Sequence, residues 1–268
     1  MLNNKLLTTA VATAVLTSAG FAQAQDKEPA IVTGDSLVEG FEISANVALV
    51  SDYRFRGISQ TGEDAAVQGG FDAAFGPGFY IGTWGSTVDF GDSNDTGSFG
   101  NLELDYYAGW SNSIGDTDFA IDVGYIYYDY PGDTVDPEGD YQEFYIGGSW
   151  KDLSLKVNYS DDYYAETDEF WYVSGDYSFT LLQDLTIGLH VGYNMLEELE
   201  LREDGSVKQG GFLSSDEDAY TDYSVTVTYN WASVDFSVAY VGTDLDDEDV
   251  FYTDNADGTA VFSISKSL

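Results

Sequence analysis

Cysteine is absent from this chain of 268 residues, which excludes disulfide bonds, thiolate metal sites and a cysteine nucleophile. Positive charge is scarce, because Lys and Arg together number 9 against 48 Asp and Glu, and the formal net charge is −39. Binding to nucleic acid is therefore not expected, since it depends on neutralising phosphates with basic side chains. The fold has to be held by buried area and hydrogen bonds alone.

Long hydrophobic runs are also missing after residue 24, where no apolar stretch approaches the roughly 20 residues of a membrane-spanning helix. Any insertion into a membrane must then be made by strands. Aromatic residues, by contrast, are plentiful: they make up 16% of the chain, and Tyr alone contributes 21. Disordered acidic chains are poor in aromatic residues, so this composition predicts a folded protein.

The first 24 residues have the pattern of a secretory signal peptide. Lys5 precedes an apolar run from Leu6 to Phe21, and Ala22-Gln23-Ala24 offers the small residues that a signal peptidase accepts. A membrane anchor is the alternative, but the run is short for one and no basic cluster follows it. We expect residues 1–24 to be removed, and we interpret the polar residues 25–40 as a periplasmic lead-in.

The rest of the chain has a period of two. Apolar and polar residues alternate from Phe41 to Leu49, so this segment has one apolar face, as a half-buried strand does. About twelve segments of this kind can be counted, and no stretch has the period of an amphipathic helix. They lie near residues 41–49, 67–75, 79–88, 102–110, 119–127, 141–150, 153–159, 170–179, 185–193, 223–229, 234–240 and 259–268.

Two all-β architectures accommodate these strands. One is a soluble sandwich or lipocalin-like barrel with the apolar face inside, and the other is an antiparallel outer-membrane barrel with the apolar face on lipid. The polar face is rich in Gly, Ser, Thr and Asn and poor in Lys and Arg, which suits the wall of a wet lumen. We predict a transmembrane β-barrel of about 12 strands over residues 41–268, of the outer-membrane type.

The lengths of the connections support this choice, because every second connection is short. Short periplasmic turns with long outer loops are typical of outer-membrane barrels. The short turns are expected at 76–78, 112–117, 151–152, 180–184 and 230–232. A loop of moderate length is expected at 57–64, and long loops are expected at 89–100, 129–140, 160–168, 194–221 and 242–258.

One stretch resembles a known family. The sequence SDYRFRGISQT at residues 51–61 resembles the signature of the TorF-type porins, a family once described only as bacterial proteins of unknown function. Residues 67–72 (VQGGFD), 78–86 (GFYIGTWGS) and 262–266 (FSISK) resemble what accompanies that signature. The resemblance spans about residues 41–268 and implies an outer-membrane, porin-like barrel without implying a substrate.

The same stretch places two arginines close together in a very acidic chain. On the first predicted strand the odd positions from Phe41 to Phe55 are expected to face lipid, so Arg54 and Arg56 are expected to point into the lumen and pair with inward acids. Two interpretations stay open: a constriction whose transverse field filters solutes, or an arginine–carboxylate ladder that braces the wall or tethers the loop at 57–64. The candidate pore-lining residues are Arg54, Arg56, Asp52, Asp72, Glu103, Asp105, Asp122 and Lys156.

The sequence does not favour an enzyme. His190 is the only histidine and has no nucleophile signature beside it, and the pair Glu103 and Asp105 lacks a defined partner for glycosidase chemistry. The acidic loops at 244–249 and 254–258 do not match the spaced calcium-loop pattern, so no dedicated metal site and no cofactor is expected. A solvated loop is one interpretation, and loose binding of divalent cations that bridge to lipopolysaccharide phosphates is another.

Two functions therefore stay open for a protein of the bacterial outer membrane. The first is a porin-like channel for passive diffusion of small solutes or ions, biased toward cations because the wall is acidic. The second is a closed structural or adhesive barrel that acts through its long acidic extracellular loops. Twelve strands give a barrel between side-chain-filled eight-stranded barrels and wide sixteen-stranded pores, so strand number does not decide between them. The expected surroundings are outer-membrane lipid and lipopolysaccharide.

Overall fold

The computed structural model describes residues 40–91, 97–201, 207–209, 211–251 and 253–268. The expected signal peptide at 1–24 and all but the last residue of the expected lead-in at 25–40 lie outside the described residues. Among the described residues, no helix has both the length and the apolar character needed to cross a membrane.

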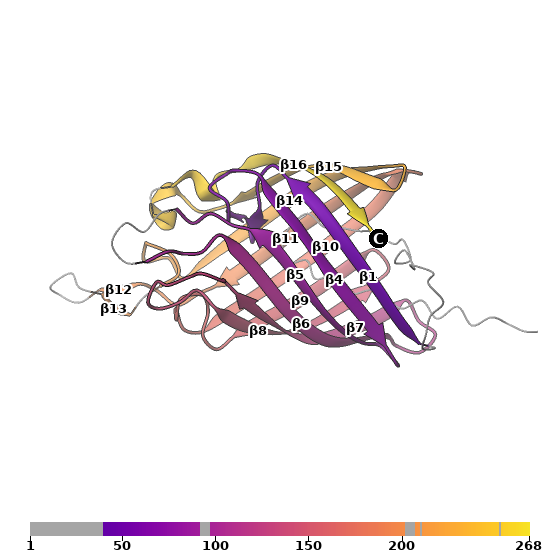
Figure 1. Cartoon of the computed structure of the whole chain (residues 1–268), viewed down its shortest axis with the longest axis horizontal. Helices are drawn as coiled ribbons and strands as arrows, with labels where there is room; N and C mark the ends of the chain where they lie inside the picture. The colour runs from indigo at the N-terminus through magenta and orange to yellow at the C-terminus, as the bar shows by residue number, and fades with distance from the viewer. Residues whose placement is uncertain (1–39, 92–96, 202–206, 210, 252) are drawn as a thin grey trace, which may run out of the picture.

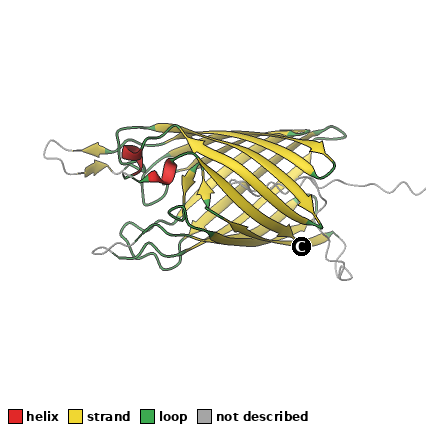
Figure 2. Ribbon diagram, turned by 90° about the horizontal axis from the view of Figure 1, so that it is seen from above, coloured by secondary structure: helices red, strands yellow, loops and turns green. Residues whose placement is uncertain are grey.

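Twelve antiparallel strands close into a single barrel, which confirms the predicted fold class (Figures 1 and 2). The ring is closed where β1 pairs with β16, from Asn46↔Ser267 to Val50↔Ser263. The strands of the wall are β1 (Phe41–Val50), β4 (Ala66–Phe75), β5 (Phe79–Thr87), β6 (Leu102–Ser113), β7 (Phe119–Asp129), β8 (Tyr141–Trp150), β9 (Leu153–Ser160), β10 (Phe170–Leu182), β11 (Leu185–Met195), β14 (Ala219–Trp231), β15 (Val234–Thr243) and β16 (Thr259–Ser267).

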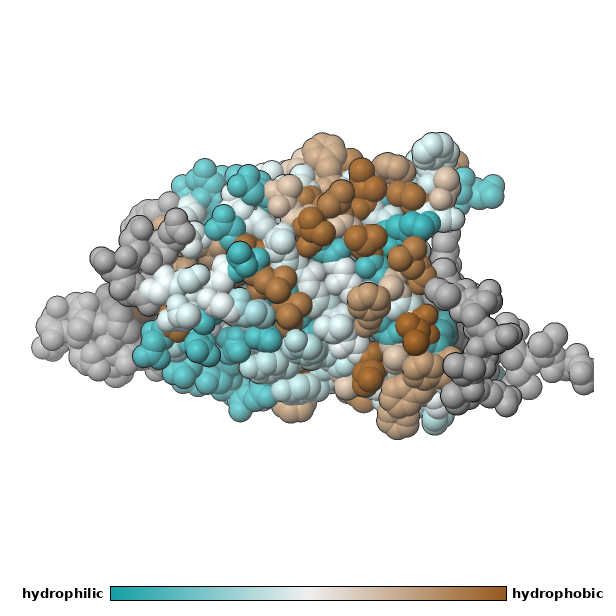
Figure 3. Space-filling view, viewed as in Figure 1, coloured by the Kyte–Doolittle hydropathy of each residue, from teal (hydrophilic) through white to brown (hydrophobic). Residues whose placement is uncertain are grey.

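The outside of the barrel is a belt of exposed apolar side chains. Strand β8 shows the rule: Phe144, Ile146 and Trp150 are exposed, whereas Tyr141, Glu143 and Tyr145, which have the opposite parity, are buried. In Figure 3 the apolar residues gather over the part of the barrel toward the tight turns, and hydrophilic residues cover the other end. The belt includes Phe41, Ile43, Val47, Leu49, Val67, Phe71, Ile81, Phe144, Ile146, Leu155, Val173, Val191, Val225, Val238, Phe262 and Ile264. In each strand the apolar residues of the alternating pattern therefore face outward, and the polar residues face the lumen.

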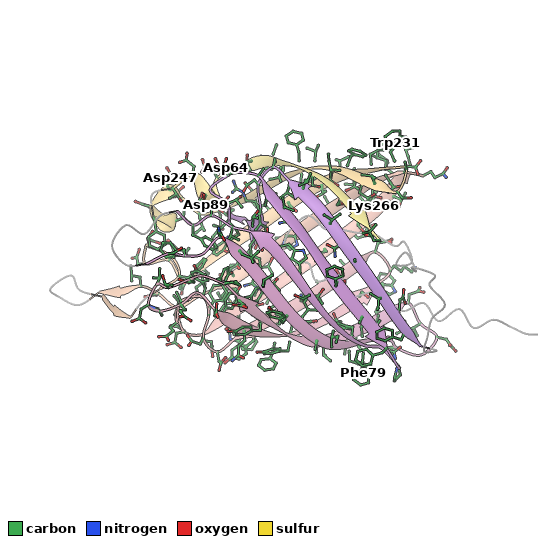
Figure 4. The ribbon with its side chains drawn as sticks, in the orientation of Figure 1. Asp64, Phe79, Asp89, Trp231, Asp247 and Lys266 are labelled. Carbon is green, nitrogen blue, oxygen red and sulfur yellow. The ribbon has the colours of Figure 1, made fainter. Side chains whose placement is uncertain are left out.

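Long and short connections alternate around the barrel as predicted. Trp231, Lys266 and Phe79 lie at the end with the tight turns, and Asp64, Asp89 and Asp247 lie at the end with the long loops (Figure 4). The long connections carry a small hairpin of β12 (Glu200–Leu201) and β13 (Val207–Gln209), and two 3-10 helices, η1 (Asp247–Val250) and η2 (Asp254–Ala256).

The first connection differs from the prediction. Strand β1 ends at Val50 instead of running on toward Phe55, and the chain then forms a short hairpin of β2 (Arg54–Phe55) and β3 (Ile58–Ser59). Tyr53 and Phe55, which were predicted to face lipid, are 2% and 8% exposed and belong to the buried core. The prediction was wrong because Tyr53 and Phe55 continue the odd-position apolar pattern of β1 although the chain has already turned inward.

Candidate functional site: the lumen and its inward hairpin

The hairpin of residues 52–61 is enclosed by the barrel. Every residue from Asp52 to Thr61 is buried, whereas Ser51 before it and Gly62 to Ala65 after it are exposed. Its tip needs two residues in the left-handed region, Arg56 with φ 48° and Gly57 with φ 84°. Gly57 packs so closely against Thr243 and Asp222 that a Cβ there would overlap the Thr243 methyl group. Only glycine therefore fits both the backbone and the space at this tip.

Arg54 holds the hairpin together and ties it to the last long loop. Its guanidinium forms ion pairs with Asp52 and, at 2.9 Å, with Glu63. Its Nη1 also donates to the backbone oxygens of Asn255, at 2.6 Å, and Asp257, at 3.1 Å, in the connection between β15 and β16. The predicted pairing of Arg54 with Asp52 is confirmed, and these contacts neutralise the Arg54 charge among the loops.

Arg56 reaches the opposite wall of the barrel. Its Nη2 donates to both carboxylate oxygens of Glu143 on β8, at 2.7 and 2.8 Å. Its guanidinium carbon lies 4.5 Å from the ring centroids of both Phe170 and Tyr172 on β10. Strands β8 and β10 flank β9, which stands opposite β1 in the closed strand order, so the hairpin and the Arg56 side chain together span the lumen.

The Arg56–Glu143 pair is fully buried and charged. Burial acts to lower the pKa of the Arg56 guanidinium, but the charge of Glu143 raises it, and the pKa ends well above its ordinary value. Glu143 accepts further hydrogen bonds from Asn158, at 2.7 Å, and from the Tyr128 hydroxyl, at 3.4 Å. Removing one partner of such a buried pair costs about 3–5 kcal/mol, because the other charge is left without compensation.

A second contact joins the hairpin to β6. The Tyr53 hydroxyl donates to Glu103 at 2.9 Å, and the Tyr53 ring packs edge-on against Trp84 with centroids 5.5 Å apart. Asp105 is buried beside Glu103 on the same strand, and its Oδ1 has no hydrogen-bond partner among the described residues. Glu103 and Asp105 had been expected to pair with the arginines, but the hairpin reaches Glu103 through Tyr53 instead.

Between the hairpin and the end of the barrel with the tight turns (below the hairpin), several tyrosine rings lie against the inner wall. Each ring covers a glycine on the neighbouring strand. Tyr107 on β6 is paired with Gly82 on β5, and its hydroxyl donates to Asp72 on β4 at 2.6 Å. A Cβ at Gly82 would overlap the Tyr107 ring. The glycine therefore lets the ring lie against the wall and bridge to a carboxylate two strands away.

The same arrangement occurs in the reverse direction on the same pair of strands. Tyr80 on β5 is paired with Gly109 on β6, and its hydroxyl donates to Asp122 on β7 at 2.7 Å. Tyr145 on β8 is paired with Gly124 on β7, and its hydroxyl meets that of Tyr80. Asp72 and Asp122 are thus bonded to tyrosines, not to the arginines as expected, and both remain partly exposed to the lumen.

The only histidine is part of a polar network on the far wall. His190 on β11 is hydrogen-bonded through Nδ1 to Asp176, at 2.7 Å, and through Nε2 to Asp222, at 2.9 Å. Tyr172 contacts both His190 Nε2 and Asp222. The inward direction predicted for His190 is confirmed, and this network joins the wall near the tip of the hairpin.

Lys156 is the cation of the wall itself. It lies on β9, between β8 and β10, with its ammonium 4.4 Å from the ring centroid of Tyr145. The nearby carboxylates of Glu143, Asp122 and Asp176 attract its charge. Sequence reasoning identified Lys156 but not the pairing of Arg56 with Glu143. The only sequence signal for Glu143 was its inward parity on β8, because the two residues are 87 positions apart.

The loops carry two further features. Three exposed carboxylates, those of Asp247, Asp254 and Asp257, offer oxygens within 4.8 Å of one another, in the acidic segments considered for divalent cations. A recess of about 360 Å³ opens among the loops, lined by Phe99, Asp133, Val135, Pro137, Gly139, Tyr164, Ala165, Glu166, Thr167 and Gly211.

Comparisons with known proteins address the family and the fold. A family model described as "Bacterial protein of unknown function (Gcw_chp)" matches residues 35–268. No curated protein matches the chain. Among solved structures, the KdgM porin is similar with a TM-score of 0.49 and 12% identity, over 84% of this chain and 97% of that one. The NanC porin is similar with a TM-score of 0.48 and 10% identity, over 83% of this chain and 97% of that one.

Proposed function

The chain belongs to this family of bacterial proteins of unknown function, and on that premise we propose that it is an outer-membrane channel for the passive diffusion of small solutes or ions. The observation that carries the proposal is a closed barrel with an apolar outer belt and a polar, carboxylate-lined interior. Such a belt would promote aggregation in water but is stabilised by contact with lipid. The resemblance of residues 51–61 to the TorF-type porins supports the same assignment.

We further propose that the channel prefers cations. Below the hairpin the described part of the wall presents the carboxylates of Asp72, Asp122, Asp176 and Asp222. The basic side chains there are Lys156 and His190. The positive charges of Arg54 and Arg56 are compensated by Asp52, Glu63 and Glu143. An excess of fixed negative charge enriches mobile cations in the pore, as rings of acidic side chains do in cation channels.

Single-channel recording of the refolded protein in planar lipid bilayers tests both statements. We expect discrete conductance steps and, across a KCl gradient, a reversal potential of the sign that K⁺ permeation gives. The preference should weaken in concentrated salt, because the screening length falls from about 10 Å at 0.1 M to about 3 Å at 1 M. A reversal potential that favours Cl⁻ would contradict the cation preference but not the channel.

A second candidate function is a closed structural or adhesive barrel that acts through its long acidic loops. The observation in its favour is the hairpin of residues 52–61, which crosses the lumen with its charges fully paired. This alternative predicts no conductance from the unaltered protein, and conductance only from a variant in which residues 52–61 are replaced by a short Gly-Ser linker. Conductance from the unaltered protein would favour the channel.

The surroundings follow from the proposed location. Lipid would contact the apolar belt, and lipopolysaccharide would surround the end with the long loops. Loose binding of divalent cations by Asp247, Asp254 and Asp257 stays a prediction. The channel proposal requires no catalysis and no cofactor.

A further inference from the structure

Arg56 occupies a socket that has the chemistry of a guanidinium-binding site. The carboxylate of Glu143 accepts two hydrogen bonds from Nη2, and the Tyr163 hydroxyl accepts one from Nη1 at 3.4 Å. Two aromatic rings lie 4.5 Å from the guanidinium carbon. Carboxylates and aromatic faces are the two groups that recognise a planar guanidinium. The socket consists of Glu143, Asn158, Tyr163, Phe170 and Tyr172, all from the wall or from the connection between β9 and β10.

The fit between Arg56 and the socket is incomplete. The buried Nε of Arg56 has no hydrogen-bond partner among the described residues, and neither has the buried Oδ1 of Asn158, which also belongs to the socket. The Arg56 backbone is held at φ 48°, a left-handed conformation that is unfavourable for a residue with a side chain. A free guanidinium compound carries no such tether, so it can reorient to use all of its donors.

The occupant belongs to a segment with exposed ends. Ser51 and the stretch from Gly62 to Ala65 are exposed on either side of the buried residues 52–61. The contacts of the hairpin with the wall include the Arg56–Glu143 pair, the Tyr53–Glu103 hydrogen bond and the packing of Phe55 against Tyr128. Release of Arg56 therefore removes the contact at the far end of the hairpin, on the wall opposite β1.

We propose that the socket is a recognition site for solutes that carry a guanidinium group, and that Arg56 is an internal occupant which such a solute displaces. Displacement frees the tip of the hairpin and widens the path through the outer half of the lumen. This inference rests on the proposed channel function. It names the substrate class, small organic cations with a planar guanidinium, and the step that admits them.

The test uses two small cations of equal charge, methylguanidinium and methylammonium, in single-channel recordings of the refolded protein. Methylguanidinium at millimolar concentration is expected to raise the open probability about tenfold, because it stabilises the undocked hairpin by binding only there. Methylammonium lacks the planar, forked donors of a guanidinium and is expected to change the open probability little. Equal responses to both cations would overturn the proposal.

Two substitutions separate the socket from its occupant. Arg56→Gln is expected to give a channel that is open without any added cation, and Glu143→Gln a channel whose opening no longer depends on methylguanidinium. Lys151→Gln, which removes one positive charge at an exposed tight turn, is the matched control and should behave like the unaltered protein. A Glu143→Gln channel that still responds to methylguanidinium would contradict the assignment of the socket.

A cross-link keeps the test decisive if those variants fold poorly. The protein has no native cysteine, and β3 of the hairpin contacts η2 of the last long loop, so Ile58→Cys with Ala256→Cys is designed to form a single disulfide that ties the hairpin down one residue past its tip. We expect the oxidised protein to ignore methylguanidinium and to regain the response on reduction. If the unaltered protein conducts steadily and neither cross-link nor methylguanidinium changes it, the inference fails while the channel stands. If neither the unaltered protein nor the hairpin-replaced variant conducts, the channel itself fails.

Discussion

At the scale of the residue, the lumen is shaped by glycines that make room for tyrosines. Gly82 and Gly109 stand opposite Tyr107 and Tyr80, and each ring lies across the glycine of the other strand. Each hydroxyl then reaches a carboxylate two strands away from its own strand, which fixes the carboxylate on the wall. A side chain at either glycine would push an aromatic ring into the lumen.

Gly82→Val should therefore destabilise the barrel by about 1–3 kcal/mol, the usual cost of overpacking a filled site. It should also reduce single-channel conductance, because the displaced Tyr107 ring would narrow the path. Gly148→Val is the control, since the nearest atom to a Cβ at this exposed position on β8 is the Ala120 carbonyl oxygen at 3.8 Å. The temperature at which the folded band is lost in semi-native electrophoresis measures the stability. Equal loss in both variants would show that the ring contact is not the cause.

At the scale of the element, parity decides which side of a strand meets lipid. On β1, Val47 is 46% exposed on the outer belt, and its neighbour Asn46 points inward and pairs with Gly70 and Ser267. The alternation read from the sequence predicted this parity because all twelve wall strands keep one apolar face.

Val47→Arg is expected to cost about 2–4 kcal/mol, the penalty of an arginine facing the middle of the bilayer. Asn46→Arg should assemble, since the new side chain enters a polar, acidic lumen. The yield of heat-modifiable barrel in the membrane fraction compares the two. Similar yields would mean that the apolar belt is not the lipid-facing surface.

The parts of this fold that sequence could not predict are those that depend on contacts between distant elements. The strands and turns could be predicted because each has a local sequence pattern, such as the alternation in β8 or the turn at Gly76-Pro77-Gly78. The inward hairpin was not, because Tyr53 and Phe55 imitate two more strand positions. The pairing of Arg56 with Glu143 required the register of the whole barrel, and so did the tyrosine–glycine pairs.

At the scale of the whole molecule, the barrel has two unlike ends. One end carries tight turns and the other carries the long acidic loops (Figure 2). The proposed orientation places the long loops outside the cell, as in outer-membrane barrels generally. Fixed charge differs between the two faces of the barrel wall, since the outer belt is apolar and the lumen wall is mainly acidic.

A protease site inserted between Asp216 and Glu217, which are exposed in the long connection before β14, should be cut when protease is added to intact cells. One inserted at Gly76-Pro77-Gly78 should be cut only after the outer membrane is permeabilised. Immunoblotting of the fragments reports both sites. Cleavage of the second site alone in intact cells would reverse the orientation.

Removing lumen acids tests the origin of the selectivity. Asp72→Asn combined with Asp122→Asn keeps the hydrogen bonds to Tyr107 and Tyr80 possible while removing two negative charges. The reversal potential in a KCl gradient should move toward zero, and more so in dilute than in concentrated salt. Asp235→Asn, near the tight-turn end of β15, is a single-charge control with a smaller expected shift.

The closure of the ring between β1 and β16 has a mechanical consequence. This seam runs from Ala45, which exchanges backbone hydrogen bonds with Leu268, to Ser51, which donates to Phe262. It is shorter than the pairing of β1 with β4, which covers the whole strand from Phe41 to Val50. Under pulling force or heat, unzipping should therefore begin at the seam. The segment that leaves β1 at Val50 is the one that Arg56 fastens to the opposite wall. Release of Arg56 from Glu143 should therefore lower the force needed to separate β1 from β16. The same release would then both open the lumen and weaken the closure of the barrel.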